Sequence, residues 1–351
     1  MTARVLVLGA SYGLLPGIRL ALAGHRVTLV GRAEEVAAMR RETLRLEMTA
    51  RRDGAPIVLT VPPGQGVELC TPPEADPAAA DMVLLAMQEP QYADPAVAEL
   101  MGRLAASSVP CLSIMNLPPP PFLARLGIGL AALDGVHASA AVWDRFAPEQ
   151  VTLASPDAQA VRLDAARPGV LTVTLASNFK AAPFARRADQ ALLERLARDW
   201  ATFKHQGQRP PVQLLAQQSL HVPLAKWPML IAGNCRCLVD GAIRPIAQAV
   251  HDDLTASEAL YRLVSELARS LGAREADLVP FEAYAKAAQG LTRPSSLARA
   301  LVNGATRVER IDLLVMRLLA AQGLYPAPLA PIVAQIETRL AENAAAIIPA
   351  A

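Results

Sequence analysis

A glycine-rich turn near the start of the chain has the composition of a phosphate-binding site. Gly9 and Gly13 follow the run Arg4 to Leu8 (RVLVL), which is typical of a buried strand that ends in a tight turn. The N–H groups at the start of a following helix attract a phosphate, and glycine lets the backbone approach it closely. Ser11 and Leu14 stand where the fingerprint GxGxxG of dinucleotide-binding proteins has its second and third glycines. We predict that a dinucleotide is held by Gly9, Ser11, Tyr12 and Gly13.

A basic residue takes the place of the acid that usually selects NAD. In NAD enzymes of this type, an Asp or Glu about 20 residues beyond the turn binds the ribose 2′-hydroxyl. Here the second expected strand, His25 to Val30 (HRVTLV), is followed by Gly31 and Arg32. A guanidinium suits a 2′-phosphate by its fixed charge and bidentate geometry, so NADP is the predicted cofactor. The alternative that Arg32 is a solvated loop cation stays open.

Strands and helices alternate through the first part of the chain, which predicts a parallel sheet. Leu14 to Ala23 is expected to be a helix, with Pro16 in its first turn, where its missing N–H has no partner to lose. Val151 to Leu153 and Val170 to Leu175 (VLTVTL) are expected to be antiparallel edge strands that finish this domain. The other expected elements are helices at 33–44, 95–106 and 188–203 and strands at 57–61, 81–87 and 110–115.

The turn formers of Gly207 to Pro211 (GQRPP) predict a domain boundary. The first domain, residues 1–206, is then a Rossmann-like α/β domain that binds NADP. The second domain, residues 212–351, is predicted to be all helical and to serve the substrate and dimerisation. Its helices are expected at 222–237, 257–270, 281–289, 295–301, 307–321 and 329–343.

Composition narrows the classes of function. The 351 residues are 52% hydrophobic and 19% charged, which predicts a globular chain of two domains. A net charge of +2 without a basic run argues against nucleic acid as a partner. No segment offers the roughly 18 uninterrupted apolar residues of a membrane span, and the start lacks the pattern of a signal peptide, so a cytoplasmic protein is expected. The spacing of the cysteines fits neither a zinc site nor a disulfide framework, so no metal is expected and the thiols are expected to be reduced: Cys70, Cys111, Cys235 and Cys237.

Several segments resemble the ketopantoate reductase family, the NADPH-dependent enzymes that reduce a 2-keto acid to a 2-hydroxy acid in pantothenate synthesis. Val27 to Arg32 (VTLVGR) is similar to the family's second strand and its NADP-selecting Arg. Asp81 to Gln91 (DMVLLAMQEPQ) and Ser113 to Leu117 (SIMNL) resemble the strands that end at the cofactor. The resemblance implies that Gln88 replaces a cofactor-contacting Lys and that Asn116 lies at the nicotinamide and the substrate.

The resemblance continues into the helical domain. Trp227 to Cys235 (WPMLIAGNC) is similar to a family segment Trp-x-Lys-Leu, whose Lys is the general acid, followed by an Asn. Met229 falls at the Lys position, and Lys226 lies one helical turn before it on the same face. Asn234 lies one residue beyond the family's Asn.

Two further segments resemble the substrate-binding part of the family. Pro294 to Leu297 (PSSL) is similar to its Ser-Ser-Met signature, which implies a role for Ser295. Glu309 to Asp312 (ERID) resembles Thr-Glu-Ile-Asp, so the family's Glu is either replaced by Arg310 or, if the register slips by one residue, kept as Glu309. The candidate catalytic residues are therefore Lys226, Asn116, Asn234, Ser295 and Glu309.

The missing Lys leaves three interpretations open. An ammonium would stabilise the negative charge that develops on the keto oxygen during hydride transfer and would deliver the proton, and methionine can do neither. Lys226 takes over this task, or another acid among Arg310, Glu309 and His221 acts on a different substrate, or the chain binds NADP without catalysis. In each enzymatic case the partner is a 2-keto acid or a related small carbonyl compound, and a homodimer is compatible with the resemblance.

A rival interpretation is an opine dehydrogenase, which also joins a nucleotide-binding domain to a helical one but condenses an amine with a keto acid. Such an enzyme relies on a His-Asp pair in the helical domain, for which His251 with Asp252 or Asp253 is the candidate. The expected fold is a Rossmann-like α/β domain followed by an all-α domain of the kind found at the C-terminus of 6-phosphogluconate dehydrogenase. The ligand site is expected between these domains.

Overall fold

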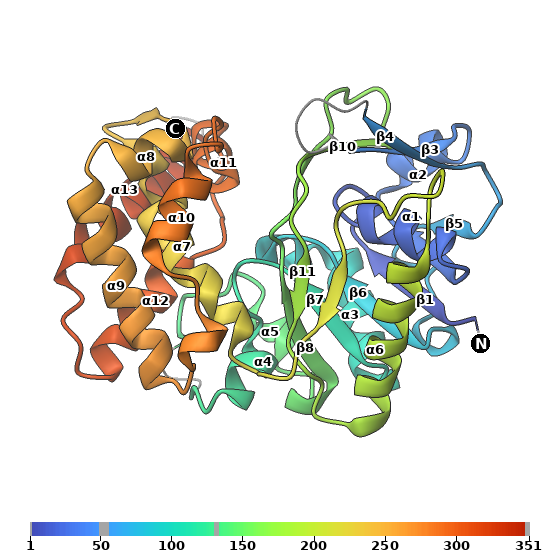
Figure 1. Ribbon diagram of the computed structural model, residues 1–351, viewed down its shortest axis with the longest axis horizontal. Coiled ribbons are helices and arrows are strands. Elements are labelled where there is room, and N and C mark those ends of the chain that lie inside the picture. Colours follow the sequence, from blue (N-terminus) through green and yellow to red (C-terminus); the bar gives the residue numbers. More distant parts are fainter. Residues whose placement is uncertain (1, 49–55, 130–132, 348–351) are drawn as a thin grey trace. The chain divides into compact units, whose positions relative to one another are not determined.

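The computed structural model describes residues 2–48, 56–129 and 133–347, and the chain divides into two compact units (Figure 1). The sheet unit comprises Met1–Arg125 and Ser139–Leu220, and the helical unit comprises Leu126–Ala138 and His221–Ala351. The boundary differs from the one expected at residues 207–211, because the strand that follows them, β12 (Leu214–Ala216), pairs with a strand of the sheet unit. The Pro-rich segment is therefore a loop within that unit.

Within the described residues the sheet unit contains one eight-stranded sheet, in the order β12-β11-β8-β7-β6-β1-β2-β5. All neighbouring pairs from β8 to β5 are parallel, whereas β11 is antiparallel to β8. The central strands are apolar on both faces because helices cover them, as in other doubly wound sheets. The strands are β1 (Arg4–Leu8), β2 (Arg26–Val30), β5 (Val67–Cys70), β6 (Met82–Leu85), β7 (Cys111–Ile114), β8 (Val151–Ser155), β11 (Phe179–Ala181) and β12.

Helices pack on this sheet because each presents an apolar stripe to it. Helix α1 buries Leu14, Leu15 and Ile18 completely, and α3 begins with an N-cap at Asp94, whose carboxylate accepts the N–H of Ala96 at 3.0 Å. The expected alternation of strands and helices is confirmed at these positions. The helices of the sheet unit are α1 (Leu14–Leu22), α2 (Ala33–Met39), α3 (Pro95–Ser107), α4 (Pro120–Arg125), α5 (Ala140–Trp143) and α6 (Arg187–Thr202).

A second, smaller sheet was not expected. It has the order β4-β3-β10-β9 and consists of β4 (Ile57–Val61), β3 (Leu44–Met48), β10 (Val170–Leu175) and β9 (Gln159–Val161). The helix expected at 33–44 already ends at Met39, because the next segment alternates buried and half-buried residues with the period of a strand.

The two strands expected as antiparallel edge strands both lie inside a sheet, and each has one parallel neighbour. Val151–Ser155 (β8) runs parallel to β7 inside the main sheet, and Val170–Leu175 (β10) pairs parallel with β3 in the second sheet. Each of them also has an antiparallel neighbour on its other side, β11 for β8 and β9 for β10. Short apolar runs do not reveal their partner, which is set by distant parts of the chain.

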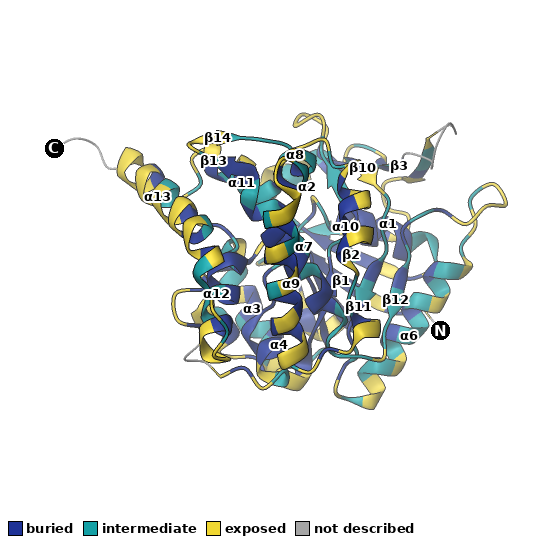
Figure 2. Cartoon of the chain, turned by 60° about the vertical axis from the view of Figure 1, so that its left-hand side comes forward, coloured by how far each residue is buried: buried dark blue, intermediate teal, exposed yellow. Residues whose placement is uncertain are grey.

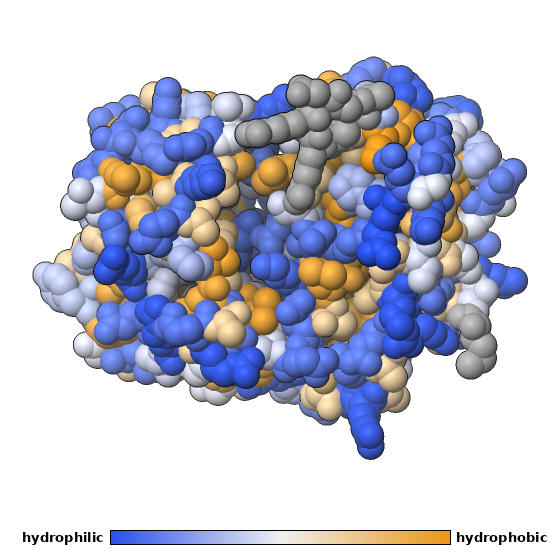
Figure 3. All heavy atoms as spheres, in the orientation of Figure 1, coloured by the Kyte–Doolittle hydropathy of each residue, from blue (hydrophilic) through white to orange (hydrophobic). Residues whose placement is uncertain are grey.

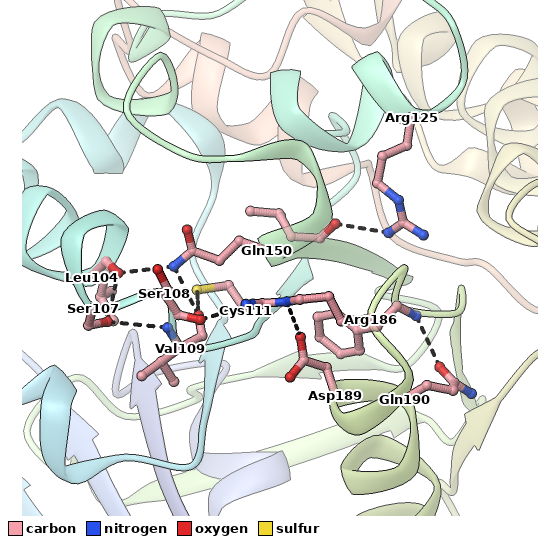
Figure 4. Close-up of polar contacts among 12 residues, drawn as sticks. Leu104, Ser107, Ser108, Val109, Cys111, Arg125, Gln150, Arg186, Asp189 and Gln190 are labelled. Atoms are coloured by element: carbon pink, nitrogen blue, oxygen red, sulfur yellow. Dashed lines mark hydrogen bonds and ion pairs between the residues drawn. The ribbon is translucent and has the colours of Figure 1, made fainter.

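Hydrogen bonds and an ion pair connect the segments that precede β7 and β8 (Figure 4). Gln150 Nε2 donates to the carbonyl oxygens of Leu104 and Val109, both at 3.0 Å. Arg186 donates to the Ser108 carbonyl at 2.9 Å and pairs with Asp189 at 2.7 Å. Burial raises the pKa of the Cys111 thiol in the same region, so this cysteine is a packing residue.

The helical unit is built from amphipathic helices, as predicted, and from one short β-hairpin. Figure 2 shows buried and exposed residues on opposite faces of α9, which buries Leu260, Val264 and Leu267. A hairpin of β13 (Leu238–Val239) and β14 (Ala242–Ile243) corrects the all-helical expectation; Asp240 and Gly241 both have positive φ, as its two-residue turn requires. The helices are α7 (Lys226–Ala232), α8 (Ile246–His251), α9 (Leu254–Ser270), α10 (Phe281–Ala288), α11 (Ser296–Val302), α12 (Ile311–Ala321) and α13 (Ala330–Ile347).

The polarity of the surface, possible membrane spans and possible metal sites bear on the kinds of site that the chain can form. Hydrophilic and hydrophobic residues are interspersed on the face drawn in Figure 3. Among the residues that the structure describes, no helix is both long and apolar enough to cross a membrane. In the same residues, no group of three or more His, Cys, Asp or Glu side chains is placed to hold a metal ion.

Candidate functional site

The glycine turn lies at the edge of the main sheet where the parallel strands end. Gly9 follows β1, between the ends of β2 and β6, and its N–H donates to the Val30 carbonyl at 3.0 Å. Its φ of +101° favours glycine. A Cβ at this position would lie 2.7 Å from the Ala86 carbonyl oxygen and 2.5 Å from Met87 Cγ. Only glycine therefore lets the turn pass this close to the end of β6.

Gly13 explains why the glycine spacing departs from the fingerprint. A Cβ on Gly13 would overlap the Gly9 carbonyl oxygen and lie 2.6 Å from Val7 Cγ1. The third glycine of the fingerprint normally allows close packing of the helix on the strand, and here Gly13 has that task. Its N–H donates to the Gly9 carbonyl at 2.9 Å, and α1 begins at the next residue.

Ser11 and Tyr12 form the exposed part of the turn and its anchor. Ser11 is exposed, whereas the Tyr12 hydroxyl donates to the Ala158 carbonyl at 2.7 Å, and its ring meets Phe179 edge-on. Burial raises the pKa of Tyr12. The Tyr12 side chain is thus committed to packing inside the sheet unit, so what Tyr12 can offer a phosphate is its backbone N–H.

Arg32 follows β2 after Gly31, and its side chain belongs to a group of three charged residues. Its side chain is 84% exposed, and its Nη2 lies 3.1 Å from Glu35 Oε1. The same oxygen accepts a bond of 2.7 Å from Arg162 Nη1, which comes from the segment after β9. Burial favours a higher pKa for Glu35, but the hydrogen bonds and charges of both arginines outweigh it and lower that pKa. Sequence reasoning missed Glu35 and Arg162.

Gln88 and Asn116 complete the same edge of the sheet. Gln88 is exposed three residues beyond the end of β6, where its N–H donates to the side chain of Gln91 at 3.0 Å in a capping box. Asn116 is half-buried just beyond β7, which pairs in parallel with β6. Carboxyl ends of parallel strands meet at one edge, so the structure brings Gly9, Arg32, Gln88 and Asn116 to that edge.

Behind this edge, Glu89 is a completely buried acid. Its Oε1 accepts the Ser139 N–H at 2.7 Å and the Ser139 hydroxyl at 2.5 Å. The indole N–H of Trp143 donates to that hydroxyl at 2.9 Å. These bonds fix the segment that follows Gln88 against helix α5.

In the helical unit, Lys226 and Met229 share one face of α7. Lys226 is its first residue and Met229 lies three residues later, and both are half-buried. The backbone carbonyl of Met229 accepts the Tyr284 hydroxyl at 3.0 Å. A Cβ on Gly233 would overlap that hydroxyl, so a glycine directly after α7 is required for this contact.

Asn234 and Ser295 are neighbours. The Ser295 hydroxyl donates to the Asn234 carbonyl at 2.8 Å and accepts the Ala298 N–H at 3.1 Å, which makes it the N-cap of α11. Ser295 is 2% exposed. Its hydroxyl is thus engaged in holding α11 against the segment after α7.

Arg310 is held in an ion pair that leaves little freedom for acid chemistry. Its Nη2 lies 2.9 Å from Asp312 Oδ2, and Asp312 is completely buried. The same nitrogen lies 3.5 Å from Glu337. Glu309 is half-buried directly before it, at the start of α12.

The histidines of the helical unit have positions that bear on the rival interpretations. The His221 ring packs closely against Gly272, just beyond α9. His251 Nε2 lies 3.0 Å from the Ala285 carbonyl, Asp252 pairs with Arg244 at 2.9 Å, and Asp253 caps α9 through the Ala256 N–H. Within the described part of the chain, His251 therefore forms no ion pair with either aspartate.

Comparisons with known proteins give a uniform result at the level of structure. No family model matches the sequence, and no curated protein matches it. A PanE/ApbA family ketopantoate reductase from Ralstonia eutropha is 20% identical, with a TM-score of 0.66 over 97% of this chain and 99% of that chain. A dimeric ketopantoate reductase from Staphylococcus aureus is 12% identical, with a TM-score of 0.63 over 97% and 99% of the two chains.

A D-mandelate dehydrogenase in complex with NADH and anilino(oxo)acetate is similar to the same extent. It is 12% identical, with a TM-score of 0.66 over 97% of this chain and 99% of that chain. These likenesses agree with the resemblance found in the sequence. The chain therefore has the fold of the ketopantoate reductases, a Rossmann-like α/β part followed by a helical part.

Proposed function

We propose that the chain is a member of the ketopantoate reductase family, an NADPH-dependent oxidoreductase that reduces a 2-keto acid to a 2-hydroxy acid. The observation that carries the proposal is the turn at Gly9, which only glycine can form against the end of β6, with Arg32 and Asn116 at the same sheet edge. Its substrate is ketopantoate or another 2-keto acid. We further propose that the protein acts in the cytoplasm and that it forms a homodimer.

The residues at this edge fit a dinucleotide. Helix α1 begins directly after the glycine turn, so the positive end of its dipole faces the turn and suits a pyrophosphate. Arg32 is exposed and charged where the 2′-phosphate of NADP would lie, and Gln88 and Asn116 follow the neighbouring strands. When bound, the nicotinamide supplies the hydride for the keto carbon.

The chain must then supply a proton and stabilise negative charge on the substrate oxygen. We assign the proton to the Lys226 ammonium, because Met229, at the position of the family's general acid, can neither donate a proton nor stabilise the charge. Asn116, Asn234, Ser295 and Glu309 are proposed to orient the substrate. Arg310 is the weaker candidate, since it is already paired with buried Asp312.

The second candidate function is NADP binding without catalysis. It is favoured by one observation, the methionine on the face of α7 that should carry the acid. Opine formation lacks such support, because His251, Asp252 and Asp253 each bond another group.

Consumption of NADPH with and without an amine separates these functions. We expect NADPH to be oxidised slowly when a 2-keto acid is added alone. Oxidation that requires an added amine would instead indicate an opine dehydrogenase. NADPH binding, followed by fluorescence, without oxidation of the cofactor by any 2-keto acid would indicate the silent protein.

A further inference from the structure

Arg32, Glu35 and Arg162 form a charged cluster beside the glycine turn. Both arginines bond Glu35 Oε1, so Oε2 takes no part in either bond. Oε2 lies 3.9 Å from the position that a Cβ on Gly31 would take, and that Cβ would be 2.8 Å from Ala10 of the turn. The carboxylate therefore stands over the end of β2, where NAD enzymes of this fold type place an acid.

The two arginines differ in how firmly they are held. Arg162 is 17% exposed and its bond to Glu35 is 2.7 Å, whereas Arg32 is 84% exposed and its bond is 3.1 Å. Arg162 Nε and Nη2 are buried and lack a hydrogen-bond partner among the described residues. A buried guanidinium that is only partly satisfied is costly, which favours a specific role for it. Arg162 anchors Oε1, and Arg32 is free to turn toward a ligand.

The carboxylate of this cluster favours NADH, whereas the exposed guanidinium favours NADPH. A carboxylate accepts a hydrogen bond from the ribose 2′-hydroxyl of NADH but repels the 2′-phosphate of NADPH. The exposed guanidinium of Arg32 attracts that phosphate. The lowered pKa of Glu35 means that its carboxylate is charged at neutral pH.

We propose that Glu35, positioned by Arg162, is a second clamp for the adenosine ribose, so that the protein accepts NADH as well as NADPH. Glu35 is then a specificity-determining residue, and Arg162 is its positioning residue. The inference rests on the proposed function, because it assumes that a nicotinamide dinucleotide binds at the glycine turn.

The test is a set of fluorescence titrations of the full chain with NADH and NADPH. In Glu35→Gln we expect NADH to bind about tenfold more weakly and NADPH several times more tightly, since the acceptor is weakened and the repulsion removed. Arg162→Met should weaken NADH with little effect on NADPH. The control is Glu34→Gln, which removes an exposed acid next to the cluster and should change neither affinity.

Three results bear on the inference in different ways. An NADH affinity of Glu35→Gln equal to that of the wild type would overturn it. If Arg162→Met does not fold, Arg162→Lys keeps the charge but not the planar guanidinium that places Nη1 on Glu35 Oε1, and a loss of NADH affinity is still expected there. Failure of the wild type to bind either cofactor would instead remove the proposed function on which the inference rests.

Discussion

Arg32 carries the distinction between the two cofactors at the scale of a single residue. Its guanidinium is exposed at the end of β2 and bonded to Glu35 only at 3.1 Å, so it can turn to a 2′-phosphate at small cost. We expect Arg32→Ala to weaken NADPH at least tenfold, about 1.4 kcal/mol, and to leave NADH nearly unchanged. Titration with both cofactors checks this, and an equal loss for the two would show that Arg32 is a loop cation.

Met229 stands where the family's general acid is expected, so the rate of ketopantoate reduction should depend on this residue. A positioned general acid contributes typically about 10²–10⁴-fold, and Lys226 is proposed to supply part of this from one helical turn away, so Met229→Lys should raise the rate of ketopantoate reduction by up to that factor. The affinity for NADPH should not change, since its proposed contacts lie in the sheet unit. Met229→Leu, which adds no ammonium, is the control and should remain slow.

Lys226 is tested by the converse change. Lys226→Ala should abolish any residual turnover of the wild type while NADPH still binds. Brisk wild-type turnover that survives Lys226→Ala would refute both the substitute acid and the Met229 assignment, and the proton donor would then have to be sought at Glu309 or Arg310.

At the scale of elements, the β1–α1 turn should tolerate no side chain at Gly9. Gly9 and Gly24 both have positive φ, but only a Cβ at Gly9 meets neighbouring atoms, whereas nothing lies within 4 Å of one at Gly24. Backbone strain of this kind costs about 1–3 kcal/mol, and overpacking adds a similar amount at Gly9 alone. We expect Gly9→Ala to unfold at lower denaturant concentration than Gly24→Ala and to be the one variant of the two that loses NADPH binding. Equal behaviour of the two variants in both measurements would argue against a cofactor at this turn.

Arg19 joins α1 to the chain between α6 and β12. It is completely buried, its Nη1 donates to the Pro211 carbonyl at 2.6 Å, and it lies over the Trp200 ring at 5.1 Å. Burial lowers its pKa to about 10. Since a buried acceptor without a donor costs about 1–3 kcal/mol, Arg19→Met should lower the free energy of unfolding by about that amount. Arg26 is exposed, so Arg26→Met should change the free energy of unfolding little. Denaturant unfolding of both variants checks this, and an equal effect of the two changes would contradict the assignment.

The elements also show what the sequence could and could not reveal. β1, α1 and β2 were predictable because their hydrophobic periods, Gly9 and Gly24 are local signals. β3 was missed because Leu44 to Met48 follows α2 without a strong turn former, and the partner of β10 was not predictable because pairing depends on residues far away in the chain. Arg162 could not be found for the same reason, as 127 residues separate it from Glu35. Glu35 had a local signal, three residues after Arg32 at the start of a helix, but the acid was expected at the end of the strand itself.

For the whole molecule, the central claim is that it transfers hydride to a 2-keto acid. The fold is shared with ketopantoate reductases and a D-mandelate dehydrogenase, although identities of 20% and 12% do not carry an activity from one chain to another. Each part of the proposal requires the full chain, because the cofactor residues belong to the sheet unit and the proposed acid to the helical unit.

The most direct measurement follows the label from NADPH deuterated at nicotinamide C4 into product. The wild-type protein is incubated with ketopantoate, with the 2-keto acid that corresponds to mandelate, and with other 2-keto acids, and the products are analysed by mass spectrometry. We predict that at least one 2-hydroxy acid carries deuterium at C2 and that its amount equals the NADPH consumed. The assignment as a reductase would be contradicted if the protein binds NADPH but none of these acids acquires deuterium.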